Sequence, residues 1–575
     1  MHECGLPAAW ANRDAWTVLD TEFRDGQRFL AAWQAWRRDP LRPRILHYVG
    51  VAMPEGFSPV PSEALEAPEL RQLAQELTAQ CKPLDPGFHR ITLEQGAVSL
   101  TLCLGSVDAM LREHVFQADT LCGRTPSNKW ATQLLARRCK RGARFHLSKA
   151  LEAPVGATPD RRLPSLLGGA GFELDETVAD SASLSGRFNP QWDIPSSRNP
   201  ARQVAPAPAR CAVIGAGLAG ASVANALALR GWRVTVLDQE STPAGGASGL
   251  PAGLAVPHVS TDDSLRSRLT RNGIRLMAQH ANRLLESGQD WEQCGVLERR
   301  PDGPALWHPQ AAWVKPYRLV QAWLAQTGIT FVGNTKIAKL RCVDSLWLLG
   351  DVQGNEIGPF EVVVIANAMG CSALLKRSNA LPESDHVAGS ELSDKLSALQ
   401  SIHGTLSHGT YAEAIPDLPA TPLNGNGCFI PHVPDAAGEQ WCVGSTFEPD
   451  ALAAADIWTQ HASNMARLQH LLADVGLEIA ETLDRGPVSQ WSASRCVTHD
   501  RMPLVGPVGT ELNAGLWLCI GMGSRGLSFS ALCAELLVAR VCAEPLPMEF
   551  SLSRSLDANR VRRKRQPKNN AQRAA

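Results

Sequence analysis

Three glycines with the spacing of a dinucleotide-binding turn stand between a predicted strand and a predicted helix. Gly215, Gly217 and Gly220 form the motif GAGLAG, preceded by the apolar run CAVI and followed by ASVANALALRG. In such a motif the first glycine makes the tight turn, the second lets the backbone approach a pyrophosphate, and the third lets the helix pack closely on the strand. The pyrophosphate would lie at the helix N-terminus, where free N–H groups and the helix dipole favour an anion.

A carboxylate follows at the end of the next predicted strand, WRVTVLD. Asp238 comes 18 residues after Gly220 and is placed to accept hydrogen bonds from a ribose diol. The strand, helix, second strand and terminal acid together supply the context that supports a GxGxxG motif. An acid at this position argues against NADP and leaves FAD and NAD open. The alternative is a tight turn that binds no ligand.

Two further stretches of small residues could contact a long cofactor. Ser248 and Gly249 lie in GGASGLPAGL, shortly after Asp238. The stretch GMGSRGLSF, which includes residues 523–527, follows a predicted strand and opens a predicted helix. A second helix N-terminus would stabilise negative charge on a reduced flavin ring. Taken alone, this second stretch is more typical of a helix cap with a surface arginine.

The composition is that of a globular protein. Of 575 residues, 44% are hydrophobic and 20% are charged, and the net charge is −1, which excludes wholesale disorder, collagen and a coiled coil. Fifteen scattered cysteines without a CxxC pair predict a reduced, cytoplasmic protein. No apolar run is long enough to cross a membrane, and the first residues lack the features of a signal peptide. We expect a monomer.

Alternating strand-like and helix-like stretches predict an α/β protein of two main units. The stretch 181–210 is rich in Ser, Pro and Ala and predicts an extended linker. We place a first domain at 1–190, a linker at 191–209, a second domain at 210–550 and a basic disordered tail at 551–575. Four histidines show no metal-ligand spacing, so we assign no metal; they are His258, His308, His432 and His499.

These pieces resemble the D-amino-acid oxidase and glycine oxidase family of FAD enzymes. They resemble more closely the C-terminal half of the MnmC family of bifunctional tRNA wobble-uridine modification enzymes. The matching stretches fall in order over about residues 211–550 and are GAGLAGASVANALALRGWRVTVLD, GGASGLPAGL, WEQCGV, WHPQAAWVKP, SRCVTHDRMPLVG and GMGSRGLSFSALCAELL. One departure is Leu250, where the family usually has Asn.

The resemblance implies a bound FAD and a D-amino-acid-oxidase-like FAD domain, in which a Rossmann subdomain carries an antiparallel-sheet substrate subdomain. The FAD contacts it assigns to this chain are Gly215, Gly217, Gly220, Asp238, Ser248, Gly249, Ile337, Gly523, Ser524, Arg525, Gly526 and Leu527.

The N-terminal half resembles the Rossmann-like methyltransferase half of the same family, with a degenerate site. In place of the family's glycine-rich GFGTGLNF, this chain has EFRDGQRF, and Glu22 and Arg24 would put side chains where S-adenosylmethionine needs a close backbone. The second strand ends in Ala52 where the family has a ribose-binding glutamate, and Ser106 stands where an aspartate near the adenine is expected. The loop CGRTPSNKW has no counterpart of the catalytic aspartate. We therefore predict that this domain keeps the fold and does not bind S-adenosylmethionine.

The resemblance also implies the substrate, a carboxymethylaminomethyl-uridine at the wobble position of tRNA. Arg495, in SRCVTHD, matches the arginine that holds the substrate carboxylate in the amine-oxidising family, where a guanidinium fork can pair both oxygens. The alternative is a salt bridge between domains. The implied products are aminomethyl-uridine and glyoxylate. Because the pocket can supply a neutral amine and alignment, we nominate no catalytic acid or base.

Two other functions stay open: a small-amine oxidase acting on glycine, sarcosine or a D-amino acid, and a noncatalytic tRNA-binding protein with structural FAD. The large N-terminal half argues against the first, and Arg495 with the two glycine-rich contacts argues against the second. Two basic clusters are either tRNA phosphate contacts or solvated helix faces. They are Arg137, Arg138, Lys140, Arg141 and Arg144, and Arg37, Arg38, Arg42 and Arg44.

Overall fold

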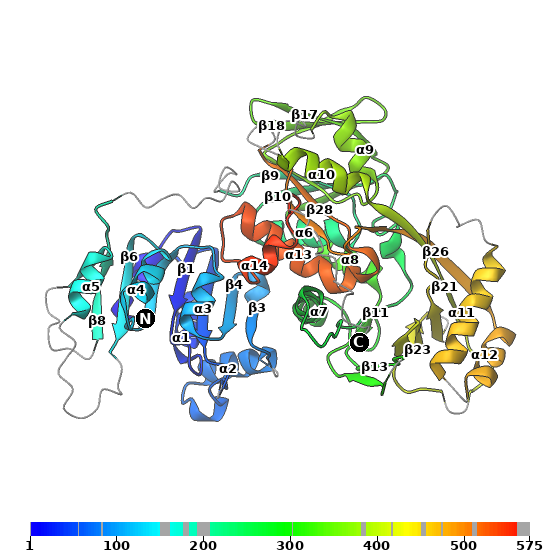
Figure 1. Ribbon diagram of the computed structural model, residues 1–575, viewed down its shortest axis with the longest axis horizontal. Helices are drawn as coiled ribbons and strands as arrows, with labels where there is room; N and C mark the ends of the chain where they lie inside the picture. The colour runs from blue at the N-terminus through cyan, green and yellow to red at the C-terminus, as the bar shows by residue number, and fades with distance from the viewer. Residues whose placement is uncertain are drawn as a thin grey trace, which may run out of the picture.

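A computed structural model gives the architecture of the chain (Figure 1). It describes residues 2–55, 57–81, 84–149, 162–175, 183–192, 207–301, 303–380, 387–415, 418–436, 438–449, 456–472, 475–508 and 514–560. No helix in these ranges is both long and apolar enough to cross a membrane.

The N-terminal part is one eight-stranded sheet with helices on both faces. The strands lie in the order β3-β4-β2-β1-β5-β6-β8-β7, and the central five are parallel. Helices α1 and α2 pack on one face, and α3, α4 and α5 pack on the other. The strands are β1 (Ala15–Asp20), β2 (Ile45–Ala52), β3 (Gly87–Leu93), β4 (Val98–Leu104), β5 (Ala118–Arg124), β6 (Cys139–Ser148), β7 (Phe172–Leu174) and β8 (Ser183–Phe188). The helices are α1 (Gln27–Arg38), α2 (Pro68–Gln80), α3 (Val107–Arg112), α4 (Lys129–Ala136) and α5 (Leu163–Gly169).

The second part is built on a six-stranded sheet in the order β16-β10-β9-β20-β28-β27, parallel except for β27. Helices α6, α7, α8 and α13 pack on one face. Because α6 and α13 are buried on nearly all sides, their sequences are almost entirely apolar or small. The elements are β9 (Arg210–Ile214), α6 (Leu218–Leu229), β10 (Arg233–Leu237), α7 (Leu265–Leu284), α8 (Pro316–Leu324), β16 (Ile329–Val332), β20 (Val362–Ile365), β27 (Leu504–Pro507), β28 (Leu516–Ile520) and α13 (Gly526–Val541).

A three-stranded sheet and two short helices complete the other face of this layer. They are β17 (Ile337–Val343), β18 (Leu346–Asp351), β19 (Glu356–Phe360), α9 (Gly370–Arg377) and α10 (Val387–Ser397). The fold is therefore α/β in both parts, as the sequence predicted.

A large, mostly antiparallel sheet forms the remaining subdomain, at the right of Figure 1. Its order is β14-β13-β22-β23-β24-β21-β25, with β26 paired to β21, and helices α11 and α12 cover one face. A small sheet, β11-β15-β12, joins it to the parallel sheet. The elements are β11 (Gly253–Ala255), β12 (Trp291–Glu292), β13 (Val296–Glu298), β14 (Leu306–His308), β15 (Ala312–Val314), β21 (Gln400–Thr410), β22 (Leu423–Gly425), β23 (Gly427–Asp435), β24 (Gly438–Gly444), β25 (Glu448–Pro449), α11 (Ile457–Leu472), α12 (Gly476–Arg485) and β26 (Val488–Val497).

Two segments differ from the sequence prediction. Residues 183–188, inside the Ser/Pro/Ala-rich stretch, form β8, because alternate side chains of this segment are buried against β6 and β7. The prediction of a disordered tail from residue 551 is wrong for residues 551–560. Helix α14 (Phe550–Arg554) is followed by the buried residues Leu556 and Ala558, which pack into the second part. The rest of the predicted tail lies outside the described residues.

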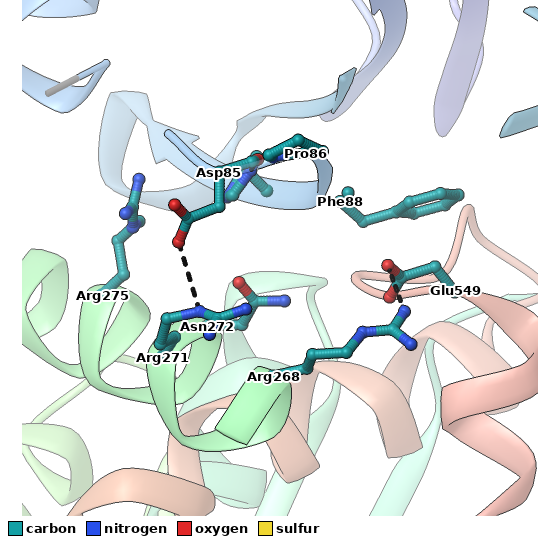
Figure 2. A pocket seen from close by; sticks show the side chains of 10 residues that line it. Asp85, Pro86, Phe88, Arg268, Arg271, Asn272, Arg275 and Glu549 are labelled. Atoms are coloured by element: carbon teal, nitrogen blue, oxygen red, sulfur yellow. Dashed lines mark hydrogen bonds and ion pairs between the residues drawn. The ribbon is translucent and has the colours of Figure 1, made fainter. Parts of the chain in front are cut away.

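The two parts share an interface between α7 and the segment around α14 on one side, and strand β3 and the end of α3 on the other (Figure 1). Gln279 of α7 accepts a hydrogen bond from the backbone N–H of Thr92 and donates one to the carbonyl of Arg90. Figure 2 shows a hollow at this seam, where Arg271 pairs with Asp85 across the interface at 3.2 Å. The N-terminal part is thus fixed to the second part by polar contacts along α7.

Candidate flavin and substrate site

The glycine turn has the geometry that a close ligand requires. Gly215 has a φ of +107°, and a Cβ placed on it would lie 2.7 Å from the carbonyl oxygen of Ala366. A Cβ on Gly220 would overlap the carbonyl of Gly215, so only glycine lets α6 approach β9. Gly217 is in ordinary extended backbone, and its Cβ would lie 3.0 Å from Oγ of Ser248. A side chain at Gly217 would crowd Ser248, on the side of the turn where this motif places a pyrophosphate.

Asp238 lies beside this turn at the carboxyl end of β10. Its Oδ2 accepts a hydrogen bond from the backbone N–H of Ala216 at 2.6 Å, and its Oδ1 accepts one from Glu240 at 2.9 Å. Ser248, in the short helix η6 (Ala247–Gly249), accepts a hydrogen bond from the backbone N–H of Leu218 at 2.9 Å. These bonds tie the first turn of α6 to both flanking segments and leave Asp238 at the edge where a ribose would lie.

The second glycine-rich stretch meets the first in space. Gly523–Arg525 form the short helix η10, and α13 begins at Gly526. A Cβ on Gly526 would lie 2.9 Å from Cδ1 of Leu218, the first residue of α6. The N-termini of α6 and α13 are therefore adjacent, although about 300 residues separate them in sequence. Leu527 is buried at the start of α13, near Gly253.

Ile337 occupies a different kind of position. It is the first residue of β17 and packs in a core with Ile214 and Leu237, the last residues of β9 and β10. Two residues earlier, Thr335 donates its backbone N–H to the carbonyl of Asp238 at 2.7 Å. The predicted contact residues therefore come together around the carboxyl ends of β9 and β10, and the glycine cradle fits a dinucleotide such as FAD.

Arg495 lies on β26 in the antiparallel sheet. Its Nη2 donates a hydrogen bond to Oγ of Ser445, and a Cβ on Gly404 would overlap the guanidinium. Gly404 thus makes room for this side chain to cross β21. Burial lowers the pKa of Arg495, because desolvation penalises its charge. Within the described residues, no carboxylate lies within ion-pair distance of Arg495, in contrast to the domain-bridging salt bridge considered from the sequence.

The face of β26 that carries Arg495 also carries Trp491. On the opposite face, the hydroxyl groups of Ser492 and Thr405 are hydrogen-bonded to each other. Asn464 of α11 donates a hydrogen bond to the carbonyl of Thr405 on that side. The strand packs against both η6 and η10. A Cβ on Gly249 would lie 3.7 Å from Nε1 of Trp491. The inner face of the sheet therefore runs alongside both glycine-rich stretches. Sequence reasoning missed Trp491, and the alternation of positions 491, 493 and 495 in a strand was the available signal.

The end of the N-terminal sheet where a methyl donor would bind is filled by side chains. Phe23 is 2% exposed and packs on Gly50 of β2, where a Cβ would overlap its ring. Arg24 and Arg124 both pair with Glu22, at 2.7 and 2.8 Å, and Arg28 pairs with it at 3.3 Å. Burial raises the pKa of Glu22, but the hydrogen bonds and charges of these arginines outweigh it and lower that pKa to about 2.

Histidines and cysteines form no metal cluster in the part of the chain that the structure describes. His308 pairs with Glu298 at 2.6 Å, and His432 pairs with Glu439 at 3.0 Å. All fifteen cysteines lie in described ranges, and each is a free thiol.

The model of the family described as FAD-dependent oxidoreductase (DAO) matches residues 210–303 and 296–540. Two relatives named tRNA 5-methylaminomethyl-2-thiouridine biosynthesis bifunctional protein MnmC match nearly the whole chain. The protein of Albidiferax ferrireducens is 46% identical over 97% of this chain and 95% of its own length. The protein of Polaromonas naphthalenivorans is 41% identical over 95% of this chain and 90% of its own. A glycine oxidase structure from Geobacillus kaustophilus matches 61% of this chain and 98% of its own, with 20% identity and a TM-score of 0.48.

The fold and the family match define the chain as an FAD-dependent oxidoreductase that acts on CH–NH bonds. More specifically, it belongs to the MnmC family of bifunctional tRNA-modification proteins.

Proposed function

We propose that this protein removes the carboxymethyl group from carboxymethylaminomethyl-uridine at the tRNA wobble position. The products would be aminomethyl-uridine and glyoxylate. The observation that carries the proposal is Arg495, a half-buried guanidinium with no ion-pair partner in the described chain, on the sheet face that runs alongside the glycine-rich stretches. A guanidinium stays charged in proteins, so a bound carboxylate would compensate a charge that burial otherwise penalises.

The other residues of the site would hold FAD. Gly215, Gly217 and Gly220 open the first turn of α6 to a pyrophosphate, Asp238 would accept hydrogen bonds from a ribose, and Gly523–Gly526 would contact the flavin end. FAD, when bound, would supply the two-electron oxidant for the methylene between the substrate nitrogen and the carboxylate, and hydrolysis of the oxidised C–N bond would release glyoxylate and aminomethyl-uridine. The chain's part is to hold the carboxylate through Arg495 and to align the methylene.

We propose that methyl transfer is lost. Phe23 and the Glu22 ion-pair cluster fill the end of the sheet that a methyl donor would need, and Ala52 and Ser106 supply no carboxylate there. Calorimetric titration with S-adenosylmethionine should show no binding. Micromolar binding would contradict this part of the proposal and leave the oxidative reaction unaffected.

The tRNA partner is proposed from the names of the relatives. Several arginines of the two basic clusters already have partners, since Arg38 pairs with Glu69 and Arg138 donates to the carbonyl of Leu111. Lys140 pairs with Asp119. The other side chains, at the exposed edges of the clusters, remain accessible to tRNA phosphates. Fifteen free thiols suit a reducing compartment, and we propose a cytoplasmic monomer.

The flavin absorbance of the purified protein under anaerobic conditions tests the reaction. tRNA bearing carboxymethylaminomethyl-uridine is added to one sample and free glycine to a parallel sample. Bleaching by the tRNA alone would support the proposal. Bleaching by glycine alone would favour a small-amine oxidase. A colourless protein that could not be reconstituted with FAD would contradict the oxidative reaction.

A further inference from the structure

The inner face of the antiparallel sheet carries a flat side chain at a fixed distance from Arg495. Trp491 and Arg495 lie four residues apart on β26, with Ala493 between them on the same face. At about 3.3 Å per residue, their Cα atoms are separated by about 13 Å. The Arg495 side chain crosses β21 at Gly404, the residue paired with Ala493, so its guanidinium lies closer to the Trp491–Leu406 pair than the Cα of Arg495 does.

Trp491 is held in an apolar wall. It packs on a cluster that includes Leu406, directly opposite it on β21, and Ile430 of β23. Leu250, just after η6, packs on the same cluster. Trp491 itself is only half-buried, and its Nε1 lies beside Gly249 of η6. An apolar wall with a partly exposed indole is suited to a flat, uncharged ring.

We infer that Trp491 is a specificity-determining residue against which the uracil ring of the substrate packs, while Arg495 holds the carboxylate. The inference rests on the proposed function. The substrate has a carboxylate at one end of a short aminomethyl link and a flat ring at the other, so its two ends can contact two side chains on one face of the same strand. The methylene to be oxidised would then lie between these two side chains, on the sheet face that runs alongside both glycine-rich stretches.

With this arrangement, the contributions of the two ends of the substrate to binding can be measured separately. Base–aromatic stacking contributes about tenfold or more to affinity per base, and it requires only the ring. Pairing with the guanidinium requires only the carboxylate. A probe without the ring, such as N-methylglycine, should therefore depend on Arg495 and not on Trp491. The free nucleoside carboxymethylaminomethyl-uridine should depend on both.

The test compares anaerobic flavin reduction in the FAD-loaded wild type, W491L, W491F and W458L. Trp458 is 64% exposed on α11, behind the other face of the same sheet, and serves as the matched control. The half-saturating concentration of the nucleoside is taken from flavin reduction. That of N-methylglycine is taken from the change in flavin absorbance on binding, which does not require that it be oxidised. Calorimetric binding of aminomethyl-uridine nucleoside, which has the ring and no carboxylate, gives a readout independent of turnover.

In the wild type we expect the nucleoside to half-saturate at a concentration about tenfold or more below that of N-methylglycine. W491L should bring this ratio of concentrations close to one and weaken aminomethyl-uridine binding by the same factor. W491F should give an intermediate ratio, and W458L should give the wild-type ratio. A ratio preserved in W491L, or no ratio in the wild type, would overturn the inference. The flavin spectrum reports whether W491L is folded, and W491F decides the question if it is not. If tRNA fails to bleach the wild type, the proposed function fails, whatever the variants show.

Discussion

Arg230, just after the end of α6, and Glu535, in the middle of α13, form a bidentate ion pair with both side chains buried. The distances are 3.0 Å from Nη1 to Oε1 and 2.9 Å from Nη2 to Oε2. Glu544 binds the remaining edge of the same guanidinium at 2.9 Å, and His47 of the N-terminal part lies 3.5 Å from Glu544. The two helices that begin at the glycine-rich stretches are thus joined at a distance from those stretches by a buried charge cluster.

Breaking this cluster should destabilise the protein strongly. Arg230→Met leaves Glu535 and Glu544 buried without their partner, and loss of one member of a buried ion pair costs about 3–5 kcal/mol of unfolding free energy. We expect a loss of this size in denaturant unfolding, together with earlier release of flavin on heating. The control is Arg341→Met, at a pair with Glu356 in which both side chains are 54% exposed; it should cost less than about 1 kcal/mol. Equal effects of the two changes would contradict a role for burial.

Obstructing the glycine turn should separate FAD binding from folding. Gly217 has ordinary backbone angles, so alanine is compatible with the chain, but its Cβ would lie 3.0 Å from Oγ of Ser248, beside the proposed pyrophosphate site. We expect Gly217→Ala to raise the dissociation constant of FAD at least about tenfold, or about 1.4 kcal/mol. The unfolding midpoint of the apoprotein should change little. Flavin content per chain and fluorescence titration of the apoprotein with FAD measure the effect, and unchanged affinity would argue against a cofactor at this turn.

Removing the guanidinium should impair the substrate step. Arg495→Ala deletes the proposed partner of the carboxylate, so KM for the modified tRNA should rise and kcat should fall together. A charge-assisted pair contributes about 1.5–3 kcal/mol, which predicts a loss of about tenfold to a hundredfold in kcat/KM. Arg495→Lys should recover part of it, because lysine keeps the charge and loses the fork. Steady-state kinetics with intact flavin content decides the matter, and unchanged kinetics would remove Arg495 from the site.

Acidification should destabilise the folded protein. Burial lowers the pKa of His89, on β3, to about 4 and that of His280, in α7, to about 3. Between pH 6.5 and 4 the unfolded chain therefore binds protons that the folded protein does not, so stability falls as pH falls through this window. From pH 7 to pH 5, His89 should account for about 2 kcal/mol of the loss.

His89→Gln should reduce that pH-dependent loss by about this amount, since glutamine stays neutral and can donate to the carbonyl of Asp85 as His89 does. His432→Gln is the control, because the side chain of His432 is 41% exposed. Denaturant unfolding at the two pH values provides the comparison. A slope unchanged in His89→Gln would show that this histidine is not held neutral.

Local patterns predicted the parts of the site that are local. Gly215 to Asp238 lie in one continuous strand–helix–strand unit, so their spacing alone predicts that they meet at one end of two parallel strands. The replacement of the family's glycine-rich loop after β1 could also be predicted from one short segment, because the replacing residues Glu22 and Arg24 lie in that turn. What the side chains do there could not be predicted. Phe23 turns inward onto Gly50 of a different strand, and Glu22 collects arginines from two separate segments.

Composition was misleading where tertiary contacts supply the stability. The stretch around β8 is rich in small polar residues, yet it completes the first sheet because β6 and β7 offer hydrogen-bonding partners. Leu552 and Leu556 lie just before the basic C-terminal end of the chain, and they fold into the second part because a buried surface is available to them.

The sequence by itself determined the α/β class, the position of the dinucleotide turn and the family, because these depend on periodicity and on motifs within short segments. Only the tertiary structure decided that the N-termini of α6 and α13 meet, that Arg495 has Trp491 as its neighbour on one face, and that Arg230 joins two distant acids. Such relationships depend on strand pairing and packing between residues far apart in the chain, and pair contacts of this kind leave no periodic signal in a single sequence.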